Sequence, residues 1–233
     1  MSSEPPTPPA PKSPRSTERS RGPGRPRRED TTDVRERLID AAIALGTARG
    51  LDAIGIREIA AEAGVTPGMI AYYFGDKGGL YQAMLDRVYR QVLANLRQIA
   101  EEPGASDEHP VARIVQLMIS TLTRTPWMPQ LIVREVIARE GPLRDFFRER
   151  IASGPATLIP ALLRREIEAG RVRADADPAL TLLSLVGMMI FPFLAHPILG
   201  ETLGYVLDES FRDRLIEHTE KLVREGLGGE VPS

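Results

Sequence analysis

The sequence predicts an all-α protein, and two features of its pattern support this. From Asp33 almost to the end, apolar residues recur every three to four positions, which is the spacing of one face of a helix. No stretch alternates apolar and polar residues, and no β-branched run is flanked by turn residues, so strands are not expected. The 233 residues fit one large domain or two small ones, at roughly 100–200 residues per domain.

Residues 1–30 differ from the rest in composition. They contain eight prolines and almost no apolar side chains, and their seven basic and four acidic groups give a net charge of +3. Such a segment buries too little surface to offset its ordering entropy, so we expect it to be disordered. Its basic cluster, with Arg25, Arg27 and Arg28, is either a solvating tail or an arm for the DNA minor groove. The Gly24-Arg25-Pro26 core resembles an AT-hook.

Turn residues and apolar spacing divide the remaining chain into helices. They predict helices over residues 33–49, 56–63, 67–74, 76–102, 110–125, 127–140, 142–170, 178–199 and 208–227. Asp33, Thr66 and Asp76 have the positions of N-caps, and Pro67 then occupies the first position of the third helix. Gly154-Pro155 predicts a kink or a split in the segment 142–170.

Ile56–Phe74 has the pattern of a helix, a tight turn and a second helix. Ala60 is small enough for another helix to cross it closely, and Gly64 takes a positive φ without strain. An ordinary αα corner has similar features. The small residue, the turn glycine and the capped third helix favour a helix-turn-helix whose second helix enters the major groove of DNA.

This part of the chain resembles a known family. Thr31 to about Val92 is similar to the N-terminal domain of TetR-type transcriptional regulators. The similarity rests on Leu38–Ile43, Gly50-Leu51, Ile56–Val65 and Tyr72–Leu80, and the last segment carries the pattern aromatic-Phe-x-x-Lys-x-x-Leu. About a quarter of the chain matches closely, and the remainder matches only in length and helical character. The composition of the N-terminal segment and the resemblance together divide the chain into four parts. These are a disordered arm (1–30), a DNA-binding domain (31–78), a ligand-binding and dimerisation domain (79–228) and a flexible tail (229–233).

The resemblance implies that the helix from Pro67 to Phe74 is the recognition helix. Tyr72 and Tyr73 offer hydroxyls to phosphates and ring faces to thymine methyl groups, and Met69 offers only apolar contacts. Lys77 matches a lysine that grips a phosphate. The expected DNA-binding residues are Arg25, Arg27, Arg28, Arg57, Thr66, Pro67, Gly68, Met69, Tyr72, Tyr73 and Lys77.

The sequence departs from the family pattern at Gly55, Ala71, Tyr73 and Gly78-Gly79. These changes remove polar contacts or loosen a turn without destroying the motif. The third helix also contains no Arg, Asn or Gln to recognise a base by two hydrogen bonds. Specificity is therefore expected to rest on DNA shape, apolar contacts and the arm. Because residues 31–100 carry no net charge, much of the electrostatic affinity for DNA is expected to come from the arm.

The last two helices are the expected dimer surface, because pairing two helix-turn-helix motifs on a palindrome raises affinity and discrimination. Their apolar residues would form an isologous four-helix interface; the alternative is that they are intramolecular core. The residues concerned are Leu180, Leu183, Val186, Ile190, Phe211, Leu215, Ile216, Leu222 and Val223.

The middle helices hold methionine and aromatic residues that suit an adaptable apolar pocket, although most such residues are simple core. By resemblance, the pocket would bind a small apolar or aromatic inducer, with Arg134, Glu135 and His196 as polar contacts. The expected ligand residues are Met118, Leu122, Trp127, Met128, Leu131, Phe146, Phe147, Met188, Met189, Phe193 and His196. Together these inferences predict a homodimeric, ligand-responsive transcriptional regulator. As in most members of this family, it would be a repressor that an inducer releases from a palindromic operator.

Other classes of function have less support. The chain has no Cys and no GxSxG, GxxxxGK[ST] or HExxH motif, so no catalytic residue, metal site or cofactor is expected. The three histidines are scattered, with His109 and His218 expected at the surface. A helical enzyme without a motif, and an architectural DNA-binding protein without an inducer, remain as alternatives.

Ala179–Gly200 contains no charged residue and is long enough to span a bilayer. It also contains Ser, Thr, His and two Pro, and a helix apolar on all sides fits equally between a core and a partner subunit. The chain begins with a polar, Pro-rich segment, so no signal peptide is expected. We therefore expect no membrane partner and a cytoplasmic protein, located with the nucleoid when bound to DNA.

Overall fold

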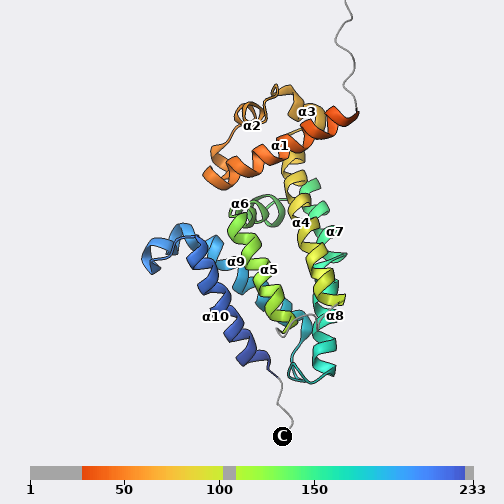
Figure 1. The fold of residues 1–233 in the computed structure, drawn as a ribbon, viewed down its shortest axis with the longest axis vertical. Coiled ribbons are helices and arrows are strands. Elements are labelled where there is room, and N and C mark those ends of the chain that lie inside the picture. The colour runs from red at the N-terminus through yellow and green to blue at the C-terminus, as the bar shows by residue number, and fades with distance from the viewer. Residues whose placement is uncertain (1–27, 102–108, 229–233) are drawn as a thin grey trace, which may run out of the picture.

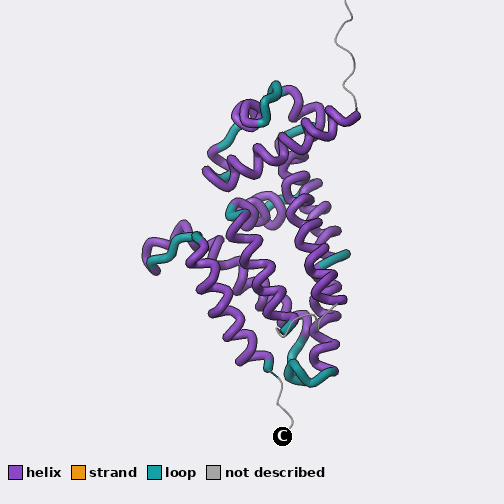
Figure 2. Tube along the Cα trace, in the orientation of Figure 1, coloured by secondary structure: helices purple, strands orange, loops and turns teal. Residues whose placement is uncertain are grey.

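The computed structural model describes residues 28–101 and 109–228, with side chains from Asp33 onward. Arg25 and Arg27 lie outside the described residues, and of Arg28 only the backbone is described. Within these ranges the secondary structure is helical apart from one isolated bridge between Val172 and Gly228 (Figure 2).

The helices form two parts that follow one another along the long axis of the molecule (Figure 1). One end holds the first three α-helices, and the remaining helices form the larger body below them, with α4 running from one into the other. In chain order the elements are α1 (Arg28–Arg49), η1 (Leu51–Ala53), α2 (Ile56–Glu62), α3 (Gly68–Phe74), α4 (Lys77–Glu101), α5 (Pro110–Arg124), α6 (Trp127–Leu131), the π-helical η2 (Ile132–Ile137), α7 (Pro142–Ala152), α8 (Pro155–Glu168), α9 (Pro178–Leu203) and α10 (Glu209–Leu227).

The helix α4 connects the two parts because its apolar stripe continues along its whole length. The side chains of Leu80, Met84, Val88, Val92 and Leu96, which are spaced as one face of a helix, are all buried. The N-terminal half of α4 packs on α1 and α3, and the remainder contacts α5, α7 and α8. The predicted cap is confirmed, since the Asp76 carboxylate accepts a hydrogen bond from the backbone N–H of Gly79 at 2.8 Å.

Two predicted helix starts were wrong. The helix α1 begins at Arg28 and not near Asp33, so residues 28–30 are helical. The helix α3 begins at Gly68, with Pro67 at the N-cap position, and Thr66 contributes its backbone carbonyl to the N–H of Met69 at 3.0 Å.

The later helices also begin or end a few residues from their predicted positions. The segment predicted over 127–140 consists of α6 and η2 and ends at Ile137. The predicted split at Gly154 is confirmed, and it separates α7 from α8. A Cβ atom on Gly154 would meet the hydroxyl oxygen of Tyr89, so a larger residue there requires the Tyr89 side chain to move. The helix α9 continues to Leu203 and ends where Gly204 takes a φ of 65°.

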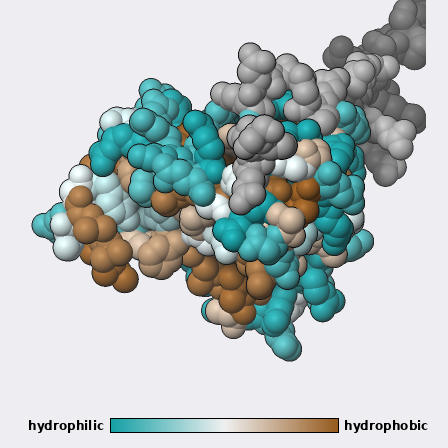
Figure 3. All heavy atoms as spheres, turned by 90° about the horizontal axis from the view of Figure 1, so that it is seen from below, coloured by the Kyte–Doolittle hydropathy of each residue, from teal (hydrophilic) through white to brown (hydrophobic). Residues whose placement is uncertain are grey.

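Helix α9 has an unusual surface. Of the described helices, it is the one whose length and composition would allow it to cross a membrane, and 22% of its most apolar stretch is buried. Large apolar side chains are exposed along it: Leu180, Leu183, Val186, Phe191, Ile198 and Leu203. Viewed from the end away from α1–α3, Figure 3 shows apolar surface on the projection that the α9–α10 connection forms in Figure 1. No element of the described chain covers these exposed apolar side chains of α9.

Candidate DNA-binding surface

The turn between α2 and α3 is built as the sequence predicts. Gly64 has a φ of 67°, which confirms its role as the residue that permits the turn. The N–H of Val65 donates to the carbonyl of Ala60 at 2.9 Å and so closes the turn. Ala60 and Ile70 are fully buried where the two helices meet. The packing of α2 against α3 is thus fixed, and α3 has one side that is free to face outward.

The outward side of α3 carries most of the predicted contact residues. Thr66, Pro67 and Gly68 are exposed, and the side chain of Tyr72 is 73% exposed. Met69 and Tyr73 are half-buried and pack against the core. The rings of Tyr72 and Tyr73 meet edge to face with their centroids 4.9 Å apart. The structure therefore places the residues predicted on this helix along one accessible edge of the molecule.

Lys77 lies at the base of this surface and already has an internal partner. Its Nζ atom donates a hydrogen bond to the carbonyl oxygen of Ile54 at 2.8 Å and lies 5.5 Å from the centre of the Tyr81 ring. The side chain is half-buried, and an ammonium group has further donors for a phosphate oxygen. Arg57 on α2 is exposed. Lys77 thus holds the start of α4 against the segment before α2, a role that the sequence did not indicate.

The start of α2 has a cap that compensates for Gly55. The Glu58 carboxylate accepts a hydrogen bond from the N–H of Gly55 at 2.8 Å and forms an ion pair with Arg49 at 2.9 Å. These two hydrogen bonds hold the pKa of Glu58 below its usual value, with the Gly55 bond contributing most. The spacing Gly55-x-x-Glu58 is the signal that would have identified this half of a capping box.

The segment that precedes α2 is held from several sides. Leu51 and Ile54 are buried, and Asp52 forms an ion pair with Arg134 of η2. Arg134 also bonds to its neighbour Glu135 at 2.8 Å. The sequence suggested Arg134 and Glu135 as polar contacts for a ligand. The structure shows them at the junction between η2 and η1, because Arg134 extends to Asp52 on the other domain.

The predicted ligand residues lie mainly inside the packed core. Leu122, Leu131, Met189 and Phe193 are at most 1% exposed, and Trp127 and Met128 are also buried. Met118, Phe147, Met188 and His196 are half-buried, and Phe146 lines a shallow groove between α4 and α7 with Gln82 and Pro142. The indole N–H of Trp127 is buried without a hydrogen-bond partner among the described residues. Most of these residues thus belong to the packed core, whereas Phe146 lies at the groove, and Trp127 leaves one buried donor unused.

Two of these residues belong to an aromatic cluster that joins α9 to α10. The Phe193 ring meets the Phe211 ring edge to face at 6.2 Å, and His196 meets Tyr205 in the same way at 5.4 Å. Tyr205 stacks on Phe211 at 4.8 Å, and its hydroxyl donates to the carbonyl of Pro192 at 2.9 Å. These contacts fix the angle between the two helices that carry the predicted dimer surface.

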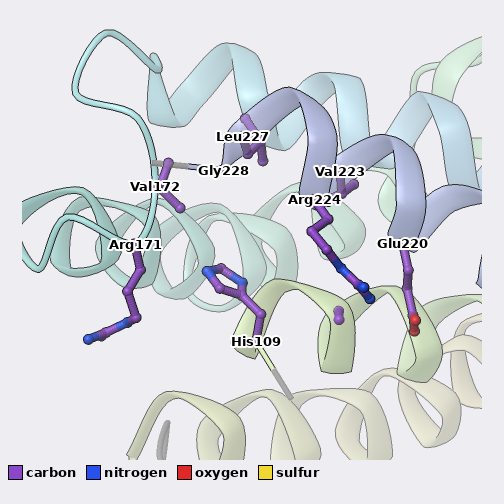
Figure 4. Close-up of a pocket in the computed structure, with 9 residues that line it drawn as sticks. His109, Arg171, Val172, Glu220, Val223, Arg224, Leu227 and Gly228 are labelled. Carbon is purple, nitrogen blue, oxygen red and sulfur yellow. The ribbon is translucent and has the colours of Figure 1, made fainter. Parts of the chain in front are cut away.

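A cavity of about 360 Å³ lies at the opposite end of the molecule from α3 (Figure 4). Its lining includes His109 at the start of α5, Arg171 before α9, and Glu220 and Arg224 on α10. The sequence placed His109 at the surface, but it is half-buried, and its Nδ1 atom caps α5 by accepting the N–H of Val111 at 3.2 Å.

Glu166, beside this cavity, is a charged residue that sequence reasoning missed. Its side chain is fully buried and accepts two hydrogen bonds from Arg171, at 2.7 and 2.8 Å. These bonds hold its pKa below the usual value against the opposing effect of burial. The Nε2 atom of His109 lies 3.7 Å from the same carboxylate. Burial lowers the pKa of His109, and this outweighs the attraction of Glu166. The cluster joins the end of α8 to the start of α5.

Comparison with known proteins identifies the domain that carries α2 and α3. Residues 38–84 match the family model described as bacterial regulatory proteins, tetR family. The HTH-type transcriptional regulator BetI of Cronobacter sakazakii is 38% identical over 86 residues, which are 35% of this chain and 41% of that regulator. The probable HTH-type transcriptional regulator YttP of Bacillus subtilis is 24% identical over 173 residues, covering 73% of this chain and 82% of its own length.

The similarity of fold extends beyond this domain. The regulator FadR of Bacillus subtilis, solved in complex with stearoyl-CoA, superposes with a TM-score of 0.61 at 19% identity, over 79% of this chain and 96% of that chain. The predicted fold class is thus confirmed: an N-terminal helix-turn-helix domain precedes a larger helical domain. Residues 38–84 therefore form a domain of the family described as bacterial regulatory proteins, tetR family.

Proposed function

We propose that this protein is a homodimeric transcriptional regulator that binds a palindromic operator in double-stranded DNA. The observation that carries the proposal is the exposed edge of α3, where Thr66, Pro67, Gly68 and Tyr72 face solvent beside the half-buried Met69 and Tyr73. Lys77 and Arg57 border this edge, and the arginines of the N-terminal segment are assigned to the same interface. Residues 31–78 supply this DNA-binding function, and residues 79–228 supply ligand binding and dimerisation.

The dimer uses the apolar stripe of α9 together with α10. Leu180, Leu183 and Phe191 are each more than 60% exposed, although burial of such side chains stabilises a protein by roughly 1.5–3 kcal/mol each. A second copy that packs the same stripe against this one, related by a two-fold axis, removes both stripes from water. The same axis relates the two recognition helices to the two halves of a palindrome. This assignment also accounts for the apolar character of α9 without a membrane.

The regulator acts as a repressor that a small apolar or aromatic inducer releases from DNA. The interior around Trp127, Leu131, Met189 and Phe193 is apolar, and the unpaired indole N–H offers one polar contact to a ligand there. The similarity to FadR, which was solved with stearoyl-CoA, supports an apolar inducer. Inducer binding favours a dimer geometry in which the two recognition helices no longer match successive major grooves. The protein acts in the cytoplasm, bound to the nucleoid when it occupies its operator.

Selection of bound duplexes from a random DNA pool, using the full chain, tests the proposal. We expect a palindromic sequence whose half-sites are about one helical turn apart, bound roughly 10³-fold or more tightly than random DNA at the same salt concentration. Tyr72→Ala should weaken this binding and leave the dimer intact, since Tyr72 is 73% exposed on α3 and distant from α9. Failure to enrich any sequence would contradict the proposed function.

The alternative is an architectural DNA-binding protein of the same fold without an inducer. It would bind palindromic and random duplexes with similar affinity at a fixed salt concentration. A variant that lacks residues 1–27 separates the contributions further, because loss of the basic segment should reduce the dependence of binding on salt. An unchanged salt dependence would show that this segment does not contact phosphates.

A further inference from the structure

The exposed edge of α3 lacks every side chain that recognises a base by two hydrogen bonds. The helix has the sequence Gly-Met-Ile-Ala-Tyr-Tyr-Phe, without Arg, Lys, Asn, Gln, Asp or Glu. Arg or Lys on guanine, and Asn or Gln on adenine, are the usual pairs of this kind. The structure leaves Gly68, Ala71 and Tyr72 exposed on this helix; Gly68 has no side chain, and Ala71 offers only a methyl group.

Tyr72 and Met69 are the larger side chains on this helix that can contact bases. They are three residues apart and therefore lie on the same side of the helix. Tyr72 is 73% exposed, and its ring is held at 85° to the ring of Tyr73, so it has a supported orientation. Met69 is half-buried against the core, which leaves part of a flexible apolar side chain at the surface. Thr66, one further turn back, is exposed and adds a methyl group.

Only one apolar group lies on the base edges of the major groove, and it is the C5-methyl group of thymine. We propose that α3 specifies its half-site through apolar contacts of Tyr72 and Met69 with thymine methyl groups. This inference rests on the proposed function and adds the chemical feature of the operator that is recognised. The hydroxyl of Tyr72, at the outer end of the ring, is then available to a phosphate and contributes affinity without sequence information.

The proposal is tested with the duplex obtained by selection, in which single thymines of each half-site are replaced by deoxyuridine. This change removes the methyl group and keeps the base pair and its hydrogen-bonding groups. At one or two positions, each methyl group removed should weaken binding about fourfold, the equivalent of about 0.8 kcal/mol. Replacing the same T·A pair by a 5-methylcytosine·guanine pair should retain more affinity than an unmethylated cytosine·guanine pair. Deoxyuridine outside the half-sites serves as the control and should have no effect.

Variants of the protein show which side chain makes the contact. In Tyr72→Ala or Met69→Ala, the penalty for deoxyuridine at the contacted position should disappear, whereas Tyr72→Phe should keep it because the ring remains. Arg57→Ala is the matched control: it should weaken binding to both duplexes and leave the penalty unchanged. Circular dichroism of each variant establishes that α2 and α3 are folded.

The outcomes separate this inference from the proposed function. If a palindrome is selected and no deoxyuridine substitution weakens binding, the recognition of thymine is wrong and the proposed function stands. If the penalty persists in both Tyr72→Ala and Met69→Ala, it does not arise from these contacts, and the inference is also overturned. If no duplex is selected, the proposed function is wrong and this inference falls with it.

Discussion

The ammonium group of Lys77 donates a hydrogen bond to the carbonyl oxygen of Ile54, with 2.8 Å between Nζ and O. The two residues stand at the start of α4 and just before α2, so the bond crosses the helix-turn-helix from one end to the other. Tyr81, one turn further along α4, also directs its hydroxyl to the carbonyl of Leu51, at 3.4 Å. A residue assigned to a phosphate contact therefore also positions α2 relative to α4.

Lys77→Ala should lower the stability of the protein as well as its affinity for DNA. The bond joins a charged donor to a backbone acceptor in a half-buried place, so its loss should cost about 1–2 kcal/mol of unfolding free energy. Urea denaturation followed by circular dichroism measures this loss. Arg57→Ala, which changes an exposed residue on α2, should weaken DNA binding with no change in stability. Equal stability of Lys77→Ala and the wild-type protein would show that Lys77 acts on DNA alone.

The ion pair between Arg134 and Asp52 joins the π-helical η2 to η1. The Asp52 side chain is largely exposed, so we expect the pair to contribute less than about 1 kcal/mol to global stability. Its effect should instead be on the coupling of the two domains. Asp52→Asn should increase amide hydrogen exchange in η1 and at the start of α2 and leave exchange in α5 and α10 unchanged.

The exchanged pair Asp52→Arg with Arg134→Asp is the control for this effect, because it restores opposite charges at the same two positions. It should return the exchange rates of η1 toward those of the wild-type protein. If Asp52→Asn leaves the exchange of η1 unaltered, the ion pair does not hold the junction.

Features that depend on nearby residues could be predicted from the sequence. The buried stripe of α4, the positive φ of Gly64, the Asp76 cap and the split at Gly154 each follow from spacings of a few residues. The contacts that the sequence did not show join residues far apart in the chain, such as Lys77 with Ile54 and Arg134 with Asp52. A periodic pattern identifies the face of a helix and contains no information about which distant residue meets it.

The ligand residues illustrate a second limit. Methionine and aromatic residues in the middle helices are equally compatible with a filled core and with a pocket, because both environments favour the same side chains. The structure buries Leu122, Leu131, Met189 and Phe193 almost completely. It uses Phe193 and His196 to join α9 to α10 through Phe211 and Tyr205. Only the packing of the whole domain distinguishes these roles.

Leu183→Glu should dissociate the proposed dimer. Leu183 is 66% exposed in the apolar stripe of α9, so the charge is tolerated in the monomer and is buried only when two stripes meet. Two-fold symmetry repeats the change in both copies, and the dimer should lose about 3 kcal/mol or more of association free energy. Sedimentation velocity measures the shift from dimer to monomer. Ile137→Glu is the control, because Ile137 is equally exposed, at 66%, and lies on η2. Monomers in both variants, or in neither, would contradict the assignment of α9.

The cluster of His109, Glu166 and Arg171 predicts that the protein becomes less stable as the pH falls. The pKa of His109 is lowered from its ordinary value of 6.5 by burial, so below pH 6.5 the unfolded chain takes up a proton that the folded protein resists. Stability therefore falls as the pH drops below 6.5. The pKa of Glu166 is lowered from 4.5 chiefly by the hydrogen bonds of Arg171, so its contribution is complete above pH 4.5 and is lost as the pH falls through the lowered value.

His109→Asn separates the pH dependence due to His109 from that due to Glu166. Asparagine can still accept the N–H of Val111 as an N-cap, but it does not titrate. The variant should lose less stability than the wild-type protein between pH 7.5 and pH 5.5, and both should lose stability below pH 4.5, where Glu166 of the unfolded chain takes up a proton. Urea denaturation at these pH values provides the comparison. An identical loss in the two proteins between pH 7.5 and pH 5.5 would show that the proton taken up on unfolding does not bind to His109.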